Sequence, residues 1–199
     1  SRRAVLGASG YTGGETLRLA VRHENIELVS LTAERHAGQD IESVFPNLAG
    51  FKLPKLAKIP DVNFEELDAV FCCLPHGTTQ EVVKALPDTL KVFDLSADFR
   101  LTDPAVYSKW YGHEHYAPAL QAEAVYGLTE HYRSMLPKKR IIACPGCYPT
   151  SALLPLLPVI KVGQISHDDI IIDSKSGVSG AGRAAKACVC SVVLTTTAS

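Results

Sequence analysis

The N-terminal segment places the strongest constraint on what this chain can fold into. An apolar run, Ala4-Val5-Leu6, is followed at once by glycines at positions 7, 10 and 13, and a helical pattern starts at Gly14. Glycines in such a turn let the backbone bend tightly and approach a pyrophosphate, which then rests on helix N–H groups. The spacing G-x-x-G-x-x-G is a variant of the common dinucleotide fingerprint. It favours nucleotide binding over the alternative, a purely structural strand-to-helix turn.

The rest of the chain alternates apolar, β-forming runs with helical patterns. We expect strands at residues 3–6, 26–31, 69–74, 91–95, 140–143 and 170–173, and helices at 14–22, at 79–85 and after Cys147. Continuous apolar strands separated by helices are typical of a parallel sheet that is covered on both faces. The sequence therefore predicts an α/β protein with a doubly wound, mostly parallel, Rossmann-like sheet.

Composition gives no indication of several classes of partner. Hydrophobic residues make up 46% of the 199 residues, charged residues 21%, and the net charge is −1. This balance gives no reason to expect a nucleic acid or an anionic membrane as partner. No apolar stretch approaches the roughly 20 residues that span a bilayer. The six cysteines lack the spacing of a disulfide framework, and we expect reduced thiols in an intracellular compartment.

Cys147 is the candidate nucleophile. It follows Pro145-Gly146 at a point where the strand at 140–143 turns into a helix. A thiol there is exposed on a tight turn, and helix N–H groups favour its thiolate form. A redox pair with Cys144 and a purely structural role remain as alternatives. A zinc site is not expected, because no second cysteine pair has suitable spacing. Cys144 itself is expected to belong to the core at the strand end.

The end of the second strand bears on the choice of cofactor. An acidic residue there would hold the ribose 2′-hydroxyl of NAD. The segment reads Leu31-Thr32-Ala33-Glu34-Arg35, with no acid directly after the strand. Arg35 could pair with a 2′-phosphate and Thr32 could donate to it, which favours NADP. The alternative is that Glu34 and Arg35 are solvated loop charges.

Two further loops carry polar groups toward the predicted sheet edge. The segment Asp94-Leu-Ser-Ala-Asp-Phe-Arg100 places a hydroxyl, a carboxylate and a guanidinium after a buried strand. Arg100 is a candidate phosphate clamp, and an Asp98–Arg100 ion pair that orders the loop is the alternative. A second glycine-serine loop, 176–182, could present N–H groups to a cofactor or act as a flexible linker.

Two stretches do not follow the strand and helix pattern. Residues 101–139 carry Trp110, tyrosines and prolines among polar residues. We expect loops and short helices there, over the carboxyl edge of the sheet. The uncharged tail 188–199 is rich in β-forming residues that have no obvious partner.

Six motifs together resemble N-acetyl-gamma-glutamyl-phosphate reductases, relatives of the aspartate-semialdehyde dehydrogenases. They occur in that family's order from Val5 to about Lys186. The motifs are Gly7-Ala-Ser-Gly-Tyr-Thr-Gly13, Leu74-Pro-His-Gly77, Asp94-Leu-Ser-Ala-Asp-Phe-Arg100, Tyr126-Gly-Leu-Thr-Glu130, Pro145-Gly-Cys-Tyr-Pro-Thr150 and Ser176-Gly-Val-Ser-Gly-Ala-Gly-Arg183. The Pro-Gly-Cys-Tyr-Pro segment is the most specific of them.

The resemblance implies an NADP-dependent acyl-phosphate reductase of arginine biosynthesis. Cys147 would form a thioester with N-acetyl-L-glutamyl 5-phosphate, and NADPH would reduce it to the semialdehyde. With Thr32 and Arg35, the implied cofactor-binding residues are Gly7, Ser9, Gly10, Tyr11, Thr12, Gly13, Pro75, His76, Ser176, Gly177, Ser179 and Gly180. The implied substrate-binding residues are Ser96, Arg100 and Glu130, and no metal is implied.

The resemblance also implies how the chain is organised. We expect an NADP-binding domain at 1–146, followed at 147–199 by the start of an α+β substrate and dimerisation domain that is incomplete here. Family members form homo-oligomers in the bacterial cytoplasm or the plant plastid stroma, and their catalytic histidine lies in a region that this chain does not contain. A non-catalytic nucleotide-binding fragment, and a reductase of a longer homologue such as aminoadipyl phosphate, are the alternative functions.

Overall fold

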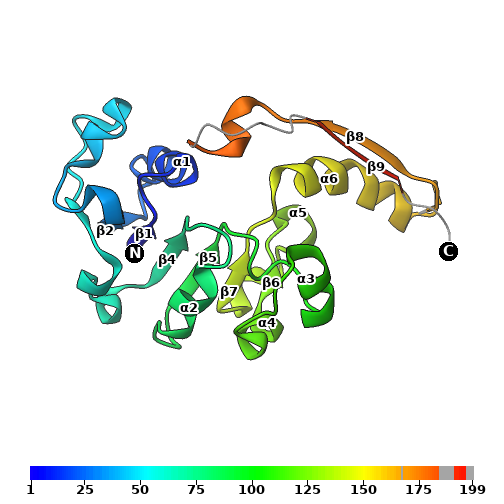
Figure 1. Ribbon diagram of the computed structural model, residues 1–199, viewed down its shortest axis with the longest axis horizontal. Helices are drawn as coiled ribbons and strands as arrows, with labels where there is room; N and C mark the ends of the chain where they lie inside the picture. Colours follow the sequence, from blue (N-terminus) through cyan, green and yellow to red (C-terminus); the bar gives the residue numbers. More distant parts are fainter. Residues whose placement is uncertain (167, 184–190, 196–199) are drawn as a thin grey trace. The chain divides into compact units, whose positions relative to one another are not determined.

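The fold consists of two compact units. The computed structural model describes residues 1–166, 168–183 and 191–195 (Figure 1). Contacts divide the chain into Ser1–Cys144, called here the N-terminal unit, and Pro145–Ser199, called the C-terminal unit. Each unit is described by itself.

A parallel sheet of seven strands forms the centre of the N-terminal unit. Its strand order is β3-β2-β1-β4-β5-β7-β6, and every neighbouring pair is parallel. The strands are β1 (Arg2–Leu6), β2 (Glu27–Thr32), β3 (Leu56–Ala57), β4 (Ala69–Cys72), β5 (Lys91–Asp94), β6 (Val125–Tyr126) and β7 (Ile141–Ala143). The helices are α1 (Tyr11–Ala20), α2 (Thr79–Lys84), α3 (Pro104–Tyr111), α4 (Pro118–Glu123) and α5 (Thr129–Tyr132). The predicted doubly wound α/β fold is confirmed.

Both faces of this sheet are buried, which explains why its strands read as continuous apolar runs. Successive side chains of a strand point to opposite faces. Ala4 and Leu6 accordingly belong to one apolar cluster, which includes Val83 of α2. Val5 belongs to the other cluster, which includes Leu17 of α1. The helices before and after β4 therefore cover opposite faces.

The segment 101–139 contains more regular structure than the sequence suggests. It forms α3, α4 and α5, and it also adds β6 to the edge of the sheet next to β7. The expectation of loops and short helices alone is therefore wrong for Val125–Tyr126. The other edge strand, β3, also falls in a segment without a strand pattern. Each of these strands has two residues, too few for a recognisable period.

The C-terminal unit combines one long helix with a two-stranded sheet. Helix α6 (Cys147–Lys161) is continuous although it contains Pro155 and Pro158. Strand β8 (Ile171–Lys175) pairs antiparallel with β9 (Ser191–Thr195). Part of the tail that had no obvious partner in the sequence thus pairs with β8. Cys188, Cys190 and the end of the motif resemblance at Lys186 lie outside the described residues.

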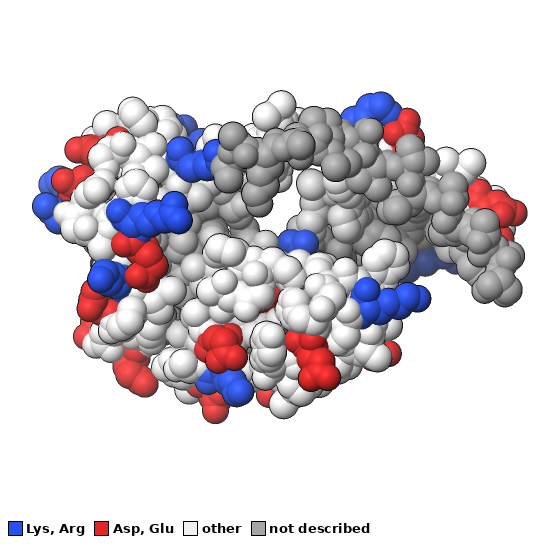
Figure 2. Space-filling view, viewed as in Figure 1, with Lys and Arg blue, Asp and Glu red and all other residues white. Residues whose placement is uncertain are grey.

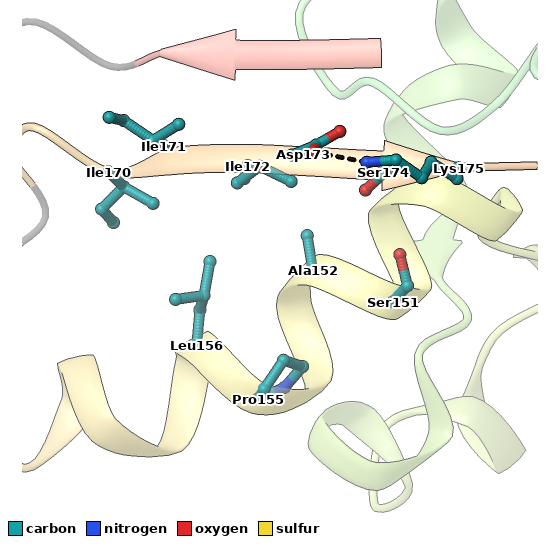
Figure 3. A pocket seen from close by; sticks show the side chains of 10 residues that line it. All are labelled: Ser151, Ala152, Pro155, Leu156, Ile170, Ile171, Ile172, Asp173, Ser174 and Lys175. Atoms are coloured by element: carbon teal, nitrogen blue, oxygen red, sulfur yellow. Dashed lines mark hydrogen bonds and ion pairs between the residues drawn. The ribbon is translucent and has the colours of Figure 1, made fainter. Parts of the chain in front are cut away.

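A pocket of about 470 Å³ lies between α6 and β8. In Figure 3, Ala152 and Leu156 point from α6 toward the strand, and Ile170 and Ile172 point back toward the helix. Ile171 lies on the other face of β8 and is 71% exposed. Ala152, Leu156, Ile170 and Ile172 therefore line a groove between α6 and β8.

On the face shown in Figure 2, the basic and acidic side chains of the N-terminal unit lie intermingled. Among the described residues, no helix combines the length and apolarity that a membrane crossing requires.

Candidate active site

The candidate site of the N-terminal unit lies where the strand order reverses. Strand β1 pairs with β2 on one side and with β4 on the other. The chain therefore adds β2 and β3 on one side of β1 and then adds β4 and the later strands on the other side. In such sheets ligands bind in the crevice at the carboxyl ends of the strands. The structure brings most of the predicted residues to this edge: Gly7, Ser9, Gly10, Tyr11, Thr12 and Gly13 after β1, Thr32 and Arg35 at the end of β2, Pro75 and His76 after β4, and Ser96 and Arg100 after β5.

The three glycines of the loop differ in how much space a side chain would have. Gly7 has φ +76°, and a Cβ there would lie 2.3 Å from the Cys73 carbonyl oxygen. A Cβ on Gly13 would lie 2.5 Å from the Gly7 carbonyl oxygen. The nearest neighbour of a Cβ on Gly10 is 3.6 Å away. Helix α1 begins directly after Gly10, and its first-turn N–H groups have no acceptor within the helix. This geometry fits a dinucleotide phosphate.

Thr32 and Arg35 have different environments. Thr32 is buried, and its hydroxyl accepts a hydrogen bond from the Gly7 N–H at 3.2 Å. This contact holds the glycine loop to the end of β2. Arg35 is exposed in the short helix Glu34–His36. The neighbouring Glu34 carboxylate accepts a hydrogen bond from the Ile59 N–H at 3.4 Å.

Asp94 is a buried carboxyl group at the end of β5. Its oxygens accept hydrogen bonds from the Ser96 N–H and hydroxyl, both at 2.9 Å. Burial raises the pKa of Asp94 from its ordinary value of 3.8 to about 6, although the Ser96 hydrogen bonds oppose this rise. The Ser96 hydroxyl also accepts from the Asp98 N–H at 3.1 Å. Ser96 therefore connects the two acids of this loop.

Asp98 pairs with a histidine and not with Arg100. Its carboxylate lies 2.6 Å from the His76 Nδ1 atom and has no exposed surface. It also accepts hydrogen bonds from three backbone N–H groups at the start of α2. The structure shows these contacts in place of the Asp98–Arg100 ion pair that was the alternative prediction. Asp98 acts as a helix cap that comes from another strand.

Arg100 contacts two backbone carbonyls. Its Nε donates to the Cys144 carbonyl oxygen at 2.8 Å, and its Nη2 donates to the Leu95 carbonyl oxygen at 3.2 Å. Three of its five N–H groups have no acceptor among the described residues. The guanidinium is thus held at the ends of β5 and β7 and retains donors for an anion. Glu130 is exposed on α5, which follows β6 at the same edge.

Cys147 is the first residue of α6 in the C-terminal unit and is exposed. Gly146 precedes the helix in an extended conformation, and its carbonyl oxygen accepts from the N–H and the hydroxyl of Thr150 at 3.0 and 2.8 Å. Pro149 lies in the first turn, where a missing N–H costs nothing. The glycine-serine loop that holds Ser176, Gly177, Ser179 and Gly180 follows β8 in this same unit.

The other described cysteines are poor nucleophiles. All four of the cysteines in the described part of the chain are free thiols. Burial raises the pKa of Cys73 to about 12 and that of Cys144 to about 11, and it raises the pKa of Cys72 strongly. The described residues contain no group of three or more His, Cys, Asp or Glu that could hold a metal ion.

Sequence reasoning missed the polar network around Asp98. Gln80 is buried, donates to the Tyr107 hydroxyl at 2.8 Å and accepts from the Tyr116 N–H at 2.6 Å. The His115 Nε2 atom lies 2.8 Å from the Asp98 carbonyl oxygen. Burial lowers the pKa of His115. No local pattern marks these residues, because their partners come from separate segments.

The fold and the glycine loop define a dinucleotide-binding α/β protein. Residues 2–138 match the family model "Semialdehyde dehydrogenase, NAD binding domain", and residues 147–194 match "Semialdehyde dehydrogenase, dimerisation domain". The chain belongs to the semialdehyde dehydrogenase family.

Comparison with individual proteins supports the resemblance drawn from the motifs. The chain is 57% identical to a probable N-acetyl-gamma-glutamyl-phosphate reductase, chloroplastic, of Arabidopsis thaliana, over 93% of this chain and 46% of the relative. It is 58% identical to the N-acetyl-gamma-glutamyl-phosphate reductase of Afipia carboxidovorans, over 92% of this chain and 53% of the relative. The chain thus spans about half the length of the curated relatives it matches.

Solved structures share the fold. The aspartate semialdehyde dehydrogenase of Candida albicans, solved with NADP, matches with a TM-score of 0.61 at 22% identity, over 90% of this chain and 52% of that one. An aspartate semialdehyde dehydrogenase II of Vibrio cholerae matches with a TM-score of 0.63 at 18% identity, over 91% of this chain and 48% of that one.

The glycine geometry predicts that two alanine substitutions affect stability to different extents. Gly7→Ala would force a side chain into a left-handed conformation and against the Cys73 carbonyl, so we expect a loss of about 2–4 kcal/mol in the free energy of unfolding. Gly10→Ala meets no close neighbour, and we expect a change within about 1 kcal/mol. Urea denaturation measures both. A Gly7→Ala variant as stable as the wild type would contradict this description of the loop.

The environment of Asp94 predicts a pH-dependent stability. Its folded pKa of about 6 exceeds the ordinary 3.8, so the neutral form favours folding and this contribution disappears as the pH rises from about 4 to about 6. Asp94→Asn cannot ionise. Relative to wild type, we expect the variant to gain up to about 3 kcal/mol of stability between pH 4 and pH 7.5, since one pKa unit corresponds to about 1.4 kcal/mol.

Urea denaturation of both proteins across this pH range measures the difference. Asp61→Asn is the matched control, because Asp61 is exposed. A difference between wild type and Asp94→Asn that does not change with pH would show that Asp94 ionises at its ordinary pKa.

Proposed function

We propose that this chain supplies the cofactor site and the nucleophile of an NADPH-dependent N-acetyl-gamma-glutamyl-phosphate reductase. The observation that carries the proposal is the exposed Cys147 at the first residue of α6. It occurs in a chain that is 51–58% identical to proteins with that name. The reaction would convert N-acetyl-L-glutamyl 5-phosphate to the 5-semialdehyde, a step of arginine biosynthesis.

NADP is the expected cofactor because of the residues that follow β2. No acidic residue follows β2 directly, and the Oε1 atom of Glu34 accepts a hydrogen bond from the Ile59 N–H at 3.4 Å. The exposed Arg35 guanidinium can pair with a 2′-phosphate. The buried Thr32 hydroxyl supports the glycine loop, so we assign it a positioning role. The pyrophosphate would rest on the open face of Gly10 and the first turn of α1.

The chemistry begins at sulfur. The Cys147 thiolate attacks the acyl-phosphate carbonyl carbon, an S–C bond forms, and the C–O bond to phosphate breaks, which releases inorganic phosphate and leaves a thioester. The cofactor, NADPH, would supply the hydride for the thioester carbon. Collapse of the resulting adduct breaks the S–C bond, so Cys147 leaves as thiolate and the aldehyde is released. Cys147 is the first residue of α6, and the partial positive charge at a helix amino terminus stabilises a nearby anion such as a thiolate.

The substrate would be bound by groups at the ends of β5 and β6. Arg100 is fixed through two carbonyls and keeps three N–H donors for phosphate or carboxylate oxygens. Ser96 is buried and bonded to both Asp94 and Asp98, so we assign it the role of shaping this loop. Glu130 is exposed at the same edge. Ser176, Gly177, Ser179 and Gly180 lie in the C-terminal unit, and their proposed cofactor-binding role rests on the resemblance of their motif to the family.

The relatives suggest the wider setting. The match of residues 147–194 to a dimerisation domain supports a homo-oligomer. We place the boundary between the cofactor domain and this second domain at 146/147. Relatives include plant proteins named chloroplastic and bacterial proteins, and the four described cysteines are free. A plastid stroma or a bacterial cytoplasm, where thiols stay reduced, agrees with both observations.

The rate of the reverse reaction tests the proposed activity. The chain is incubated with N-acetyl-L-glutamate semialdehyde, inorganic phosphate and NADP, and formation of NADPH is followed by absorbance. We expect phosphate-dependent NADPH formation, and a loss of about a thousandfold or more in rate for Cys147→Ser, because a hydroxyl is a far weaker nucleophile than a thiolate. The same assay with the aminoadipate homologue tests the chain length of the substrate.

Cys144→Ser is the matched control for this experiment. Its thiol is half-buried with a pKa raised to about 11, so we expect the rate to change less than about twofold. Alkylation by iodoacetamide provides a second measurement, and Cys147 should be labelled faster than the other described cysteines. Equal rates for wild type and Cys147→Ser would exclude Cys147 as the nucleophile.

Substitution of Arg35 tests the choice of cofactor. Arg35→Ala should weaken NADPH binding about tenfold or more, because a charge-assisted contact to the 2′-phosphate is lost. NADH binding should change less than about twofold. Fluorescence titration measures both, with Arg22→Ala as the control, since Arg22 is exposed before the start of β2. Equal losses for the two nucleotides would contradict recognition of the phosphate by Arg35.

A further inference from the structure

The hydrogen-bond ladder between β5 and β7 is interrupted at the carboxyl end of the N-terminal sheet. These strands are parallel neighbours, and the Cys144 N–H donates to the Asp94 carbonyl oxygen at 2.7 Å. In a regular parallel ladder the next bond would run from the Ser96 N–H to the Cys144 carbonyl oxygen. The Ser96 N–H donates instead to the Asp94 Oδ1 atom at 2.9 Å. The Cys144 carbonyl therefore needs a donor from another group.

The Arg100 guanidinium supplies this donor. Its Nε atom donates to the Cys144 carbonyl oxygen at 2.8 Å, and its Nη2 atom donates to the Leu95 carbonyl oxygen at 3.2 Å. One side chain thus connects the residue that follows β5 with the residue that follows β7. Because both the N–H and the carbonyl group of Cys144 are held, the peptide group that follows Cys144 has a fixed direction.

This fixed peptide group leads directly to the candidate nucleophile. Only Pro145 and Gly146 lie between Cys144 and Cys147. The proline ring fixes the φ angle of Pro145, and the Gly146 carbonyl already accepts hydrogen bonds from the first turn of α6. Rotation is left only about the ψ angle of Pro145 and the two angles of Gly146. Because three residues of extended chain span about 11 Å at most, Cys147 stays close to the held carbonyl.

Arg100 therefore has a role toward the polypeptide that does not depend on a ligand. Its Nε atom is committed to the Cys144 carbonyl, whereas three other N–H groups have no acceptor among the described residues. We propose that Arg100 is a positioning residue for the nucleophile: by holding this carbonyl it sets the place of Cys147, independently of any contact between its other N–H groups and the substrate. This inference rests on the proposed function, because it concerns the rate at which Cys147 reacts.

One step of the proposed reaction requires Cys147 but no phosphate. In the reverse direction, the Cys147 thiolate adds to the aldehyde carbon of N-acetyl-L-glutamate semialdehyde and forms the S–C bond. A hydride then leaves this carbon for NADP, and the carbonyl re-forms as a thioester. Without inorganic phosphate the reaction stops after a burst of at most one NADPH per chain. The burst rate constant at saturating semialdehyde therefore reports on Cys147 separately from phosphate binding.

Two substitutions separate the Nε donor of Arg100 from its charge. In Arg100→Gln, the amide nitrogen takes the place of Nε, so the donor is kept and the charge is lost. In Arg100→Lys, a methylene group takes that place, so the donor is lost and the charge is kept. We expect the burst rate constant of Arg100→Lys to lie about tenfold or more below that of Arg100→Gln, because a small displacement of a reacting group can cost about a hundredfold in rate.

The steady-state reaction with phosphate should show the opposite order. The KM for phosphate should rise more in Arg100→Gln than in Arg100→Lys, because only lysine keeps a positive charge for the anion. Arg100→Met lacks both the donor and the charge, and its burst should be as slow as that of Arg100→Lys. This variant differs from Arg100→Gln mainly in the donor, so the comparison of these two also tests the proposal without any difference in charge.

Arg22→Gln and Arg22→Lys are the matched controls, since Arg22 is exposed before the start of β2. Their burst rate constants should differ from each other less than about twofold. If Arg100 served only to bind phosphate, its three variants would have equal burst rate constants, and that result would overturn the positioning role. A burst that is slowest in Arg100→Gln would also overturn it. A wild-type chain that forms no NADPH would refute the proposed function itself.

Discussion

The candidate site of the N-terminal unit depends on the parallel pairing of β1 with both β2 and β4. Parallel strands end at the same edge of a sheet, so this pairing brings three loops to one crevice. At the base of the crevice, the backbone of Gly7 packs directly against the Cys73 carbonyl. A Cβ at Gly7 would lie 2.3 Å from that carbonyl oxygen. The hydroxyl of Thr32 then fastens the third loop to the first. A side chain at Gly7 would separate all of these groups.

Two buried carboxyl groups lie next to this crevice, and the fold stabilises them in different ways. Asp98 receives three backbone N–H groups and the His76 imidazole, which compensate the loss of hydration of a charge. Among the described residues, the Asp94 carboxyl group accepts hydrogen bonds only from Ser96, and its burial favours the neutral acid. Hydrogen bonds of this kind hold polar side chains in fixed orientations. Such side chains need little reorganisation when a ligand binds.

Several features of the fold and site could be predicted from local sequence. Apolar runs predicted the five longer strands of the N-terminal sheet within two residues at each end, since burial on both faces produces a continuous apolar signal. The strands β3 and β6 were missed because two residues carry no period. The partner of the β-forming tail could not be predicted either, because antiparallel pairing with β8 joins segments whose register depends on the intervening chain.

The amino-acid sequence by itself determined the parts that depend on neighbours along the chain. The glycine spacing predicted the turn before α1, and Pro145-Gly146 before an apolar run predicted that Cys147 would begin a helix. Only the tertiary structure decided that Asp98 faces His76 and that Arg100 holds the Cys144 carbonyl. These contacts join loops from different strands, and their geometry follows from how the strands are ordered and paired, which no local pattern encodes.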